Sequence, residues 1–489
     1  MIHVADLRFA YPALAGGLSS GDLWPPLSFT VAAGEALAVM GASDSGKSTL
    51  CHILAGLAPR YTDGEVGGRV RVAGHDVLGA RPPLRTVGVL FQDAAMQLFN
   101  ASVETEVAWG LEALGLVPDA IDARVAEALA RFGLRGLAKR SPGALSGGQQ
   151  KRLALASVWA MRPRVWLLDE PLGGLDPQGR REVLAALDTL RQGGTTLLLT
   201  TLRPQAARMS PRALLLHPPE TSHHATAALL DAESALVEAG VHYPPRFWPA
   251  LTGPTREAPA VTLEGVAFRY AAGQSPVLHD INLRIPQGQF VALVGANGAG
   301  KSTLARLLNG LLRPERGTVR VMGEPTAEQA VGALARRVGF LFQRPEQQIF
   351  GTTVREEIAY GPRQLRLPEV ERRVAAALER FALDAVADVP PAVLGYGRRR
   401  AVTLAALSAL DTPILVLDEP TVGLDGRGWA QLLAWLRARR AAGVTLILIT
   451  HEMALAACAD RVVALEAGRV VADGPPDAVL PGIDAGALA

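Results

Sequence analysis

The sequence contains few cysteines and no long hydrophobic run. Its two cysteines, Cys51 and Cys458, fall in different halves of the chain, so we expect small buried side chains within helices rather than a disulfide or a metal site. Hydrophobic residues make up 49% of the chain, yet no apolar run approaches the roughly 20 residues needed to cross a bilayer. No basic region precedes an apolar stretch at the first residues, so no signal peptide is expected. These absences indicate a soluble, cytoplasmic protein with large cores.

The chain also has a small net charge and few lysines. The formal net charge is +2, which leaves no global field to attract nucleic acid or an anionic membrane surface. Among 49 basic residues only four are lysines, namely Lys47, Lys139, Lys151 and Lys301. A general preference for arginine explains this bias over most of the surface. Against that bias, Lys47 and Lys301 occupy a position where a compact ammonium group would have to reach phosphate oxygens.

That position belongs to two glycine-rich segments of the same form. They are Gly41-Ala-Ser-Asp-Ser-Gly46-Lys47-Ser48-Thr49 and Gly295-Ala-Asn-Gly-Ala-Gly300-Lys301-Ser302-Thr303. Both fit the phosphate-binding pattern GxxxxGK[ST]. Each follows a short apolar run without helical period, which predicts a buried parallel strand leading into a helix. We expect backbone N–H groups and the helix dipole to bind the phosphates of ATP, and Ser48 and Ser302 to hold Mg²⁺.

A second strand pattern places acidic residues downstream of each loop. Residues 165–168 and 414–417 are apolar and are followed by Asp169-Glu170-Pro and Asp418-Glu419-Pro. Buried parallel strands present such groups at their carboxyl ends, where α/β proteins bind ligands. We expect Asp169 and Asp418 to bind Mg²⁺, and Glu170 and Glu419 to orient and polarise the attacking water. A turn that merely follows a strand is the alternative for a single copy.

These elements form an internal repeat. The offset is 254 residues from Lys47 to Lys301, 251 from Gln92 to Gln343, and 249 for the Asp-Glu pairs and for Asp176 and Asp425. The repeat predicts two domains, at residues 1–218 and 259–489, joined by a linker at residues 219–258. Within the linker, residues 229–241 are expected to be helical and residues 243–249 to form an extended tether.

Between the first loop and its acids stands the segment Leu145-Ser146-Gly147-Gly148-Gln149. Ser146 is a natural helix N-cap, and the glycines allow backbone amides to approach a charged ligand. With the surrounding motifs, this segment resembles the ATP-binding cassette (ABC) family over nearly the whole chain. The resemblance implies two tandem P-loop NTPase domains of α/β class, each with a mainly parallel sheet core and a helical subdomain.

The resemblance also implies how ATP is bound. The two domains would pair head to tail, so that the P-loop of one faces the signature turn of the other, with ATP and Mg²⁺ between them. Ser146, Gly147, Gly148 and Gln149 would then contact ATP. Gln92 and Gln343 would reach the metal, and Gln343 would also serve catalysis. Tyr11 and Tyr270 in the first strand of each half would stack on adenine, although an aromatic residue that packs in the core is the alternative.

The second copy departs from this pattern at its signature turn, and the first copy departs after the strand expected at residues 196–201. Gly395 and Tyr396 stand where the first half has Ser146 and Gly147, so the capping hydroxyl is lost and a bulky ring is added. In the first half, residues 196–201 run into Leu202, whereas their counterpart runs into His451 (451 − 202 = 249). A histidine can contact the γ-phosphate and the water, but leucine cannot. The first P-loop also carries Asp44 where the second has Gly298.

If the halves pair head to tail, all these losses fall on one of the two sites. The weak site would contain Lys47, Asp169, Glu170 and Leu202 with the turn at Tyr396. The competent site would contain Lys301, Asp418, Glu419 and His451 with the turn at Ser146. We therefore expect the second site to hydrolyse ATP and the first mainly to bind it.

Residues 342–361 indicate which process the hydrolysis of ATP would power. They begin Phe-Gln-Arg-Pro-Glu-Gln-Gln and are echoed at residues 91–110, which begin Phe-Gln-Asp-Ala-Ala-Met-Gln. The segment is similar to the Gln-loop region of the ATPases of energy-coupling factor (ECF) importers, which carry vitamins, their precursors, or cobalt and nickel. The resemblance implies a peripheral protein on the cytoplasmic side of the cell membrane. Integral membrane subunits would dock near residues 92–110 and 343–361, unless this is ordinary subdomain surface.

Two other functions remain open. The ATPase of a sugar importer would differ mainly in lacking the Pro-x-x-Gln element after Phe-Gln. A non-transport ABC protein that acts on ribosomes or DNA would need a basic, helical arm. Residues 219–258 hold five acidic and two basic residues, so no nucleic acid partner is expected.

Overall fold

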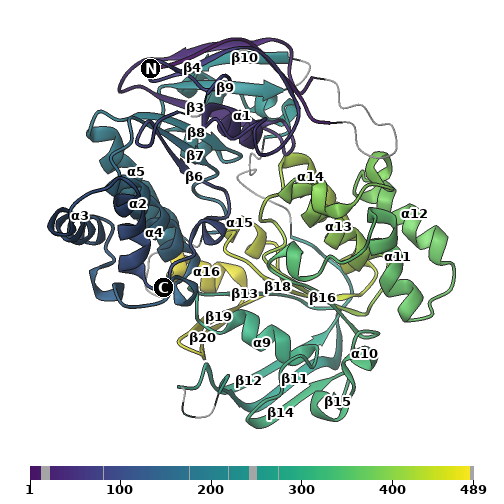
Figure 1. Cartoon of the computed structure of the whole chain (residues 1–489). Coiled ribbons are helices and arrows are strands. Elements are labelled where there is room, and N and C mark those ends of the chain that lie inside the picture. The colour runs from purple at the N-terminus through teal and green to yellow at the C-terminus, as the bar shows by residue number, and fades with distance from the viewer. Residues whose placement is uncertain are drawn as a thin grey trace. The chain divides into compact units, whose positions relative to one another are not determined.

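The computed structural model describes residues 1–12, 22–80, 82–175, 177–217, 220–241, 250–271, 273 and 275–484. The chain divides into two compact units, Met1–Tyr243 and Pro244–Ala489 (Figure 1). Asp176 and the expected tether at residues 243–249 lie outside the described residues.

The first unit contains a six-stranded, mainly parallel sheet. Its strands, in spatial order, are β10 (Glu220–Ala225), β9 (Arg212–His217), β3 (Ala36–Gly41), β8 (Thr196–Thr201), β7 (Val165–Asp169) and β6 (Val87–Leu90). Only β10 is antiparallel to its neighbour. Every residue of β3, β7 and β8 is buried, as expected for strands covered on both faces. A second, antiparallel sheet has the order β2 (Leu27–Val31), β1 (Ile2–Ala10), β4 (Glu65–Val72) and β5 (His75–Asp76).

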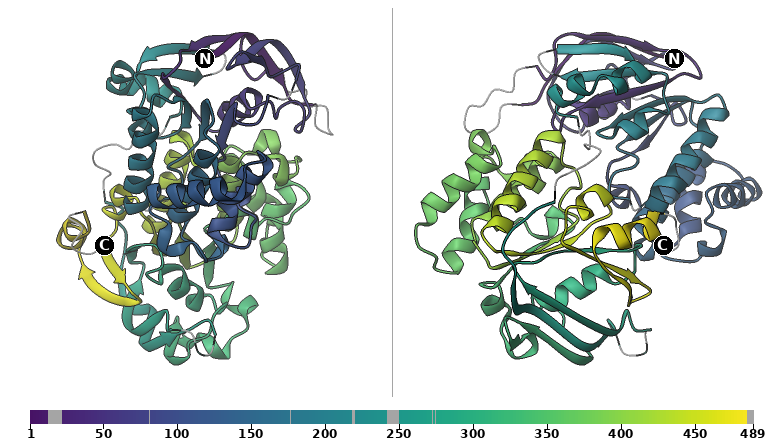
Figure 2. Two further views of the ribbon diagram at one scale, coloured as in Figure 1. Left: turned by 60° about the vertical axis from the view of Figure 1, so that its left-hand side comes forward. Right: turned by 180° about the vertical axis from the view of Figure 1, so that it is seen from behind.

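Helices complete the first unit. They are α1 (Lys47–Leu54), α2 (Val103–Ala113), α3 (Pro118–Arg131), α4 (Gly147–Ala160), α5 (Pro177–Gln192), α6 (Pro204–Ala207), α7 (Thr226–Asp231) and α8 (Glu233–Glu238), with a 3₁₀ turn η1 (Ala94–Gln97). The helices α2, α3 and α4 form the helical part and lie to one side of the sheets (Figures 1 and 2). The apolar side of α3 packs into a core cluster that also contains the strands of the parallel sheet.

The second unit repeats this architecture. Its parallel sheet has the order β16 (Val338–Leu341), β17 (Ile414–Asp418), β18 (Thr445–Ile449), β13 (Phe290–Val294), β19 (Arg461–Glu466) and β20 (Arg469–Gly474). Its antiparallel sheet has the order β12 (Leu278–Gln287), β11 (Arg256–Phe268), β14 (Arg316–Val321) and β15 (Glu324–Pro325). The helices are α9 (Lys301–Leu308), α10 (Val331–Leu334), α11 (Val354–Gln364), α12 (Val370–Arg380), α13 (Tyr396–Ser408), α14 (Gly426–Ala441), α15 (Met453–Ala456) and α16 (Pro476–Asp484), with the 3₁₀ turn η5 (Pro345–Gln347). The fold class expected from the sequence is therefore confirmed.

The boundary between the units differs from the expected one. Strand β10 pairs residue by residue with β9, and α7 follows β10 directly. Residues 220–241 thus form part of the first unit rather than a linker, because β10 completes the edge of its sheet. Instead of one helix at residues 229–241, the structure has two short helices that break at Ala232, and the second ends at Glu238. On the other side, Leu251 is buried in the core of the second unit.

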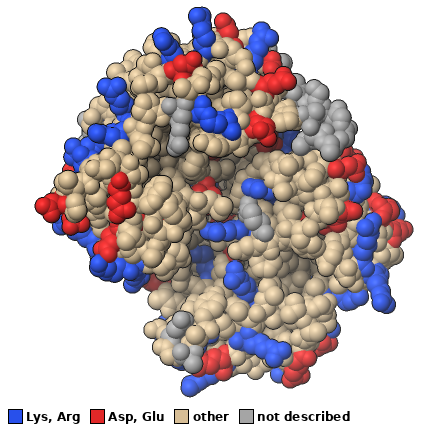
Figure 3. Space-filling view, in the orientation of Figure 1, with Lys and Arg blue, Asp and Glu red and all other residues tan. Residues whose placement is uncertain are grey.

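Three further expectations concern single residues and the surface. Cys51 is buried within α1, whereas buried Cys458 follows the short helix α15 instead of lying within it. No helix among the described residues is both long enough and apolar enough to span a membrane. On the face shown in Figure 3, basic and acidic side chains are both spread over the surface, in keeping with a net charge of +2.

Candidate nucleotide-binding sites

Each P-loop connects the central strand of its parallel sheet to a helix. In the first unit the loop joins β3 to α1, and in the second it joins β13 to α9. The Lys47 ammonium donates to the carbonyls of Gly41 and Ala42 at 2.9 and 2.6 Å. Lys301 likewise donates to two carbonyls of its own loop, at 2.7 and 2.8 Å. Both ammonium groups are therefore held over loops that lead into helix N-termini, which is where phosphate binds.

The glycine before each lysine is required by its backbone conformation. Gly46 has φ 85° and Gly300 has φ 98°, in the left-handed region. A Cβ atom at Gly46 would lie 2.5 Å from the ring of Trp24. Trp24 is 1% exposed, and its indole nitrogen donates to the Ser45 carbonyl at 2.8 Å. Sequence reasoning missed this anchor of the first P-loop; the second unit has Leu278 at that place.

Asp44 lies at the tip of the first P-loop. Its backbone has φ 60°, close to the 84° of Gly298 at the same place in the second loop. Aspartate is among the residues that tolerate this conformation, so the loops keep one shape. The Asp44 side chain is exposed. A carboxylate at this tip adds negative charge to a loop built to receive a polyanion.

The predicted acids lie at the carboxyl ends of β7 and β17. In each sheet one strand, β8 or β18, stands between that strand and the strand that leads into the P-loop. Glu170 and Glu419 follow these strands with φ 46° and 48°, an unusual conformation for a residue other than glycine. Both side chains are buried, at 7% and 5% exposure. The same strained turn in both units aims a carboxylate at the edge of the sheet where the P-loop begins.

The two aspartates have different partners. In the second unit the Ser302 hydroxyl hydrogen-bonds to Asp418, so the two expected Mg²⁺ ligands lie together. In the first unit Asp169 Oδ1 accepts from the Thr200 hydroxyl at 2.6 Å. The second unit has Ile449 at the position of Thr200, which explains the difference. A magnesium ion in the first site would share Asp169 with this hydroxyl.

His451 meets both catalytic elements of the second unit. Its Nε2 lies 3.6 Å from Glu419 Oε1 and 3.1 Å from Asn297 Oδ1 in the P-loop. At the corresponding place in the first unit, Leu202 offers no polar atom and is 9% exposed. The structure thus brings Glu419 and His451 together in the second unit, and adds Asn297 to them.

The two signature helices begin differently. Ser146 caps α4 in a capping box, in which its hydroxyl accepts from the Gln149 amide at 3.3 Å and the Gln149 side chain accepts from the Ser146 amide. Gly395 is the N-cap of α13 and gives no side-chain cap. A Cβ at Gly423, which has φ 81°, would lie 2.3 Å from the ring of Tyr396. The Tyr396 ring therefore rests against the turn after the second Asp-Glu pair.

The resemblance implies that two tyrosines contact adenine and that two glutamines reach the metal. Tyr11 and Tyr270 follow β1 and β11 and are 37% and 54% exposed, so neither is a core aromatic. The Tyr11 hydroxyl lies 2.8 Å from the hydroxyl of Thr49 after the P-loop lysine, and Tyr270 is paired in the same way in the second unit. Gln92 follows β6 and Gln343 follows β16; within the described residues neither side chain hydrogen-bonds to the acids.

Comparison with known proteins decides the family. Residues 25–173 and 278–422 match the family of ABC transporter ATP-binding domains. The chain belongs to the ABC transporter family. An ABC transporter ATP-binding protein of Bifidobacterium longum is 33% identical over 97% of this chain and 66% of its own length. One of Streptomyces avermitilis is 34% identical over 97% of this chain and 94% of its own length. Among solved structures, cbiO1 from Clostridium perfringens, part of the ABC transporter complex cbiONQ, is 30% identical and covers 47% of this chain and 93% of that chain, with a TM-score of 0.42.

In this ABC transporter ATPase, burial alters the acidity of carboxyl groups at both Asp-Glu pairs. Burial raises the pKa of Glu170 to about 7, and the neighbouring Lys47 only partly opposes that rise. Burial also raises the pKa of Asp418, against the Ser302 hydrogen bond and the charge of Lys301. Burial therefore favours the protonated form of Glu170 in the nucleotide-free unit.

One position in the ABC signature helix anchors a different loop in each unit. Lys151 in α4 is 5% exposed and donates to the carbonyls of Glu170, Pro171 and Gly173 at 3.0, 3.1 and 2.8 Å. Burial lowers the pKa of Lys151 to about 8. In the first unit, the signature helix is thereby tied to the turn that carries Glu170.

Arg400 occupies the equivalent position in α13 (400 − 151 = 249) and is fully buried. It donates to the carbonyl of Phe342 at 2.7 Å and to that of Gln343. The second signature helix is thus tied to the Gln-loop instead. Both residues were missed from the sequence. A signal was available, because Lys151 is one of only four lysines and the 249-residue offset of the repeat places it opposite Arg400.

Proposed function

We propose that this ABC ATPase energises an importer of the ECF type, which takes up a vitamin, a vitamin precursor, or cobalt or nickel. It would bind ATP and Mg²⁺ and dock as a peripheral protein on integral membrane subunits at the cytoplasmic side of the cell membrane. The observation that carries the proposal is a pair of exposed aromatic rings after the Gln-loop, present in both units and held in place by a buried glutamate.

In the second unit the pair is Phe350 and Tyr360. The ring centroids lie 4.4 Å apart in an edge-on arrangement, and the residues are 61% and 46% exposed. Glu357 is 4% exposed and accepts from the backbone amides of Phe350 and Gly351 at 2.9 and 2.7 Å. A charged acceptor on two amides fixes the loop that presents the rings. Rigid, exposed aromatic residues are typical anchors of protein interfaces.

The first unit has the same arrangement. Phe99 and Trp109 lie 4.9 Å apart between ring centroids and are 63% and 51% exposed. Glu106 is 4% exposed and accepts from the amides of Phe99 and Asn100 at 3.0 and 2.7 Å. Nearby Met96 is 84% exposed and adds an adaptable apolar contact. Each unit thus offers one aromatic docking patch, as expected for two membrane contacts.

The Pro-x-x-Gln element supports an ECF importer over a sugar importer. Pro345 begins η5, and Gln348 Oε1 accepts from the Phe342 amide at 3.3 Å. The first unit lacks the proline, but Gln97 makes the matching bond to the Phe91 amide at 3.3 Å. The Asp93 side chain there accepts from the Ala95 amide and caps η1. Both loops are therefore folded back onto their strands and can present the aromatic patch.

We further propose that the two units pair head to tail and hydrolyse ATP at one of two composite sites. The competent site would join the second P-loop, Glu419 and His451 to the first unit's Ser146 turn. The other would join the first P-loop, Glu170 and Leu202 to the turn at Tyr396, and would mainly bind ATP. Leu202 in place of a histidine and the Thr200-bound Asp169 both favour weak hydrolysis there.

Capture of the membrane partner tests this proposal. The tagged full chain would be expressed in its cell of origin, and detergent-solubilised membranes would be purified with Mg²⁺ and a non-hydrolysable ATP analogue. The variants Phe350→Ser/Tyr360→Ser and Phe99→Ser/Trp109→Ser remove one patch each. The control Tyr61→Ser removes a ring that is 65% exposed and lies outside both patches.

The expected result is an integral transport subunit that co-purifies with a small membrane protein able to bind a vitamin or a metal ion. Each patch variant should lose most of this complex, and Tyr61→Ser should retain it. Recovery of sugar permeases, or of ribosomes or DNA without a membrane subunit, would overturn the proposal. Equal recovery by wild type and patch variants would overturn the docking surface.

A further inference from the structure

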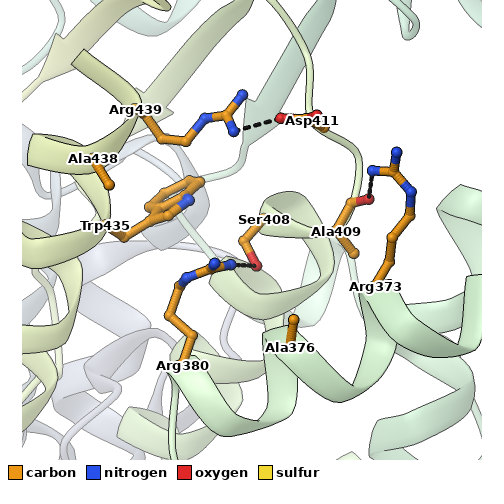
Figure 4. Close-up of a pocket in the computed structure, with 9 residues that line it drawn as sticks. All are labelled: Arg373, Ala376, Arg380, Ser408, Ala409, Asp411, Trp435, Ala438 and Arg439. Carbon is orange, nitrogen blue, oxygen red and sulfur yellow. Dashed lines mark hydrogen bonds and ion pairs between the residues drawn. The ribbon is translucent and has the colours of Figure 1, made fainter. Parts of the chain in front are cut away.

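A surface cavity of about 240 Å³ lies in the second unit, away from its nucleotide site. Residues of α12, of the end of α13 and of α14 line it (Figure 4). At roughly 30 Å³ per water molecule, this space holds about eight waters or one small ligand. It touches both the helical part of the unit and α14, which follows the turn after the Asp-Glu pair.

Among the polar groups of the lining, hydrogen-bond donors outnumber acceptors. Three arginines face the cavity with one carboxylate, which leaves a net charge of +2 from 3 − 1. Arg439 is paired with Asp411 at the rim. Arg373 donates to the carbonyl of Ala409 at 3.3 Å. This hydrogen bond uses one of the acceptors in the lining, so fewer acceptors remain for a ligand. A ligand here must therefore supply acceptors and negative charge.

Arg380 and Trp435 are the lining donors whose hydrogen bonding a ligand would improve most. Arg380 is exposed, and among the described residues its guanidinium makes one hydrogen bond, a 3.4 Å contact to the Ser408 hydroxyl. Trp435 is 3% exposed, and its indole nitrogen is buried without a hydrogen-bond partner in the described residues. An indole N–H can only donate, and a buried donor without a partner is rare. Figure 4 shows the Trp435 ring between Arg439 and Arg380, so one bound anion could reach all three.

The first unit is built differently at the same positions. An offset of 249 places Trp159 where the second unit has Ser408, and Ala186 where it has Trp435. Arg131, the counterpart of Arg380, has its guanidinium carbon 5.0 Å from the centre of the Trp159 ring. The arginine is thus engaged by an aromatic ring rather than left with a weak hydroxyl contact. The first unit is therefore a natural version of this site, in which the arginine contacts a tryptophan ring.

We propose that the cavity binds a small phosphate-bearing anion, either inorganic phosphate or the phosphoryl group of a small metabolite. A phosphoryl group carries about −1.5 to −2 charges at neutral pH, which matches the surplus of +2 better than a single carboxylate does. Its several oxygens can accept from Arg380, Arg439 and the Trp435 indole together, and guanidinium groups suit bidentate phosphate contacts. Bound there, the anion bridges α12 and α14. The site does not depend on which solute is transported.

Calorimetric titration of the full chain tests the proposal. Both P-loops bind phosphate groups, so every variant would carry Lys47→Ala and Lys301→Ala to weaken that background equally. The probes are sodium phosphate and glycerol 3-phosphate, with sodium chloride at matched ionic strength as the control for screening. Ser408→Trp/Trp435→Ala copies the arrangement of the first unit into the second, and Arg380→Gln removes one exposed donor without altering packing.

One anion per chain is expected to bind when the cavity is intact. Arg380→Gln should weaken that binding about tenfold or more, and Ser408→Trp/Trp435→Ala should abolish it while the thermal unfolding profile stays cooperative. Binding of both probes assigns the site to phosphate in general, and binding of the ester alone assigns it to a metabolite. Identical titrations for all cavity variants, or no binding of either probe, would overturn the proposal.

Discussion

Replacing Glu419 with glutamine is expected to remove most ATP turnover, whereas the same change at Glu170 should leave at least about half of it. A positioned general base contributes about 10²–10⁴-fold in rate, so the loss at Glu419 should be about 100-fold or more. Glu419 lies 3.6 Å from His451, and the two can act on one water. Leu202 stands in the unit of Glu170 at the position that His451 has in the second unit, and burial raises the pKa of Glu170 to about 7.

Steady-state release of phosphate by the full chain with Mg²⁺ and ATP measures both effects. Binding of a fluorescent ATP analogue to each variant separates lost binding from lost chemistry. Glu466→Gln, on an exposed residue at the end of β19, is the matched control and should behave as wild type. Equal losses in the Glu419 and Glu170 variants would refute the asymmetry, and so would a larger loss at Glu170.

Three further predictions concern buried groups. Arg400→Met should lower the free energy of unfolding of the second unit by about 3 kcal/mol or more, because two carbonyls lose charged donors, and should lower the rate of ATP turnover through the loosened Gln343 loop. Glu170→Gln should stabilise the nucleotide-free chain at pH 8 but not at pH 4. The raised folded-state pKa of Glu170 contributes stability that is complete below pH 4.5 and is lost as pH rises through about 7, whereas glutamine does not titrate. Glu357→Ala should destabilise the second unit by about 2–5 kcal/mol, because it leaves the amides of Phe350 and its neighbour without their acceptor.

Urea unfolding checks the first and third of these predictions, and thermal unfolding over a pH series checks the second. Arg400→Lys should recover part of the stability, since one ammonium can reach one of the two carbonyls. Glu379→Ala, an exposed position of α12, is the control for Glu357→Ala. An unchanged turnover rate in Arg400→Met would contradict the proposed link to the Gln-loop. A pH-independent difference between wild type and Glu170→Gln would show that its folded-state pKa is not raised.

Elements set by local pattern were predictable from the sequence. The P-loops, the buried strands before them and the Asp-Glu turns are encoded in short runs of residues whose spacing dictates their backbone. The contrast between His451 and Leu202 also followed from register alone, because both residues come directly after equivalent strands.

The partners of buried polar groups were decided only by the tertiary structure. Lys151 and Arg400 share one position in the repeat, yet the lysine binds the turn after β7 and the arginine binds the loop after β16. Asp169 accepts a hydrogen bond from the Thr200 hydroxyl. Strand β10 pairs with β9 at the edge of the sheet, which its composition had not suggested. Each outcome depends on which distant segments packing brings within hydrogen-bond reach. Local spacing carries no record of such contacts, so the sequence alone determined where the catalytic groups stand, and the fold determined what holds them.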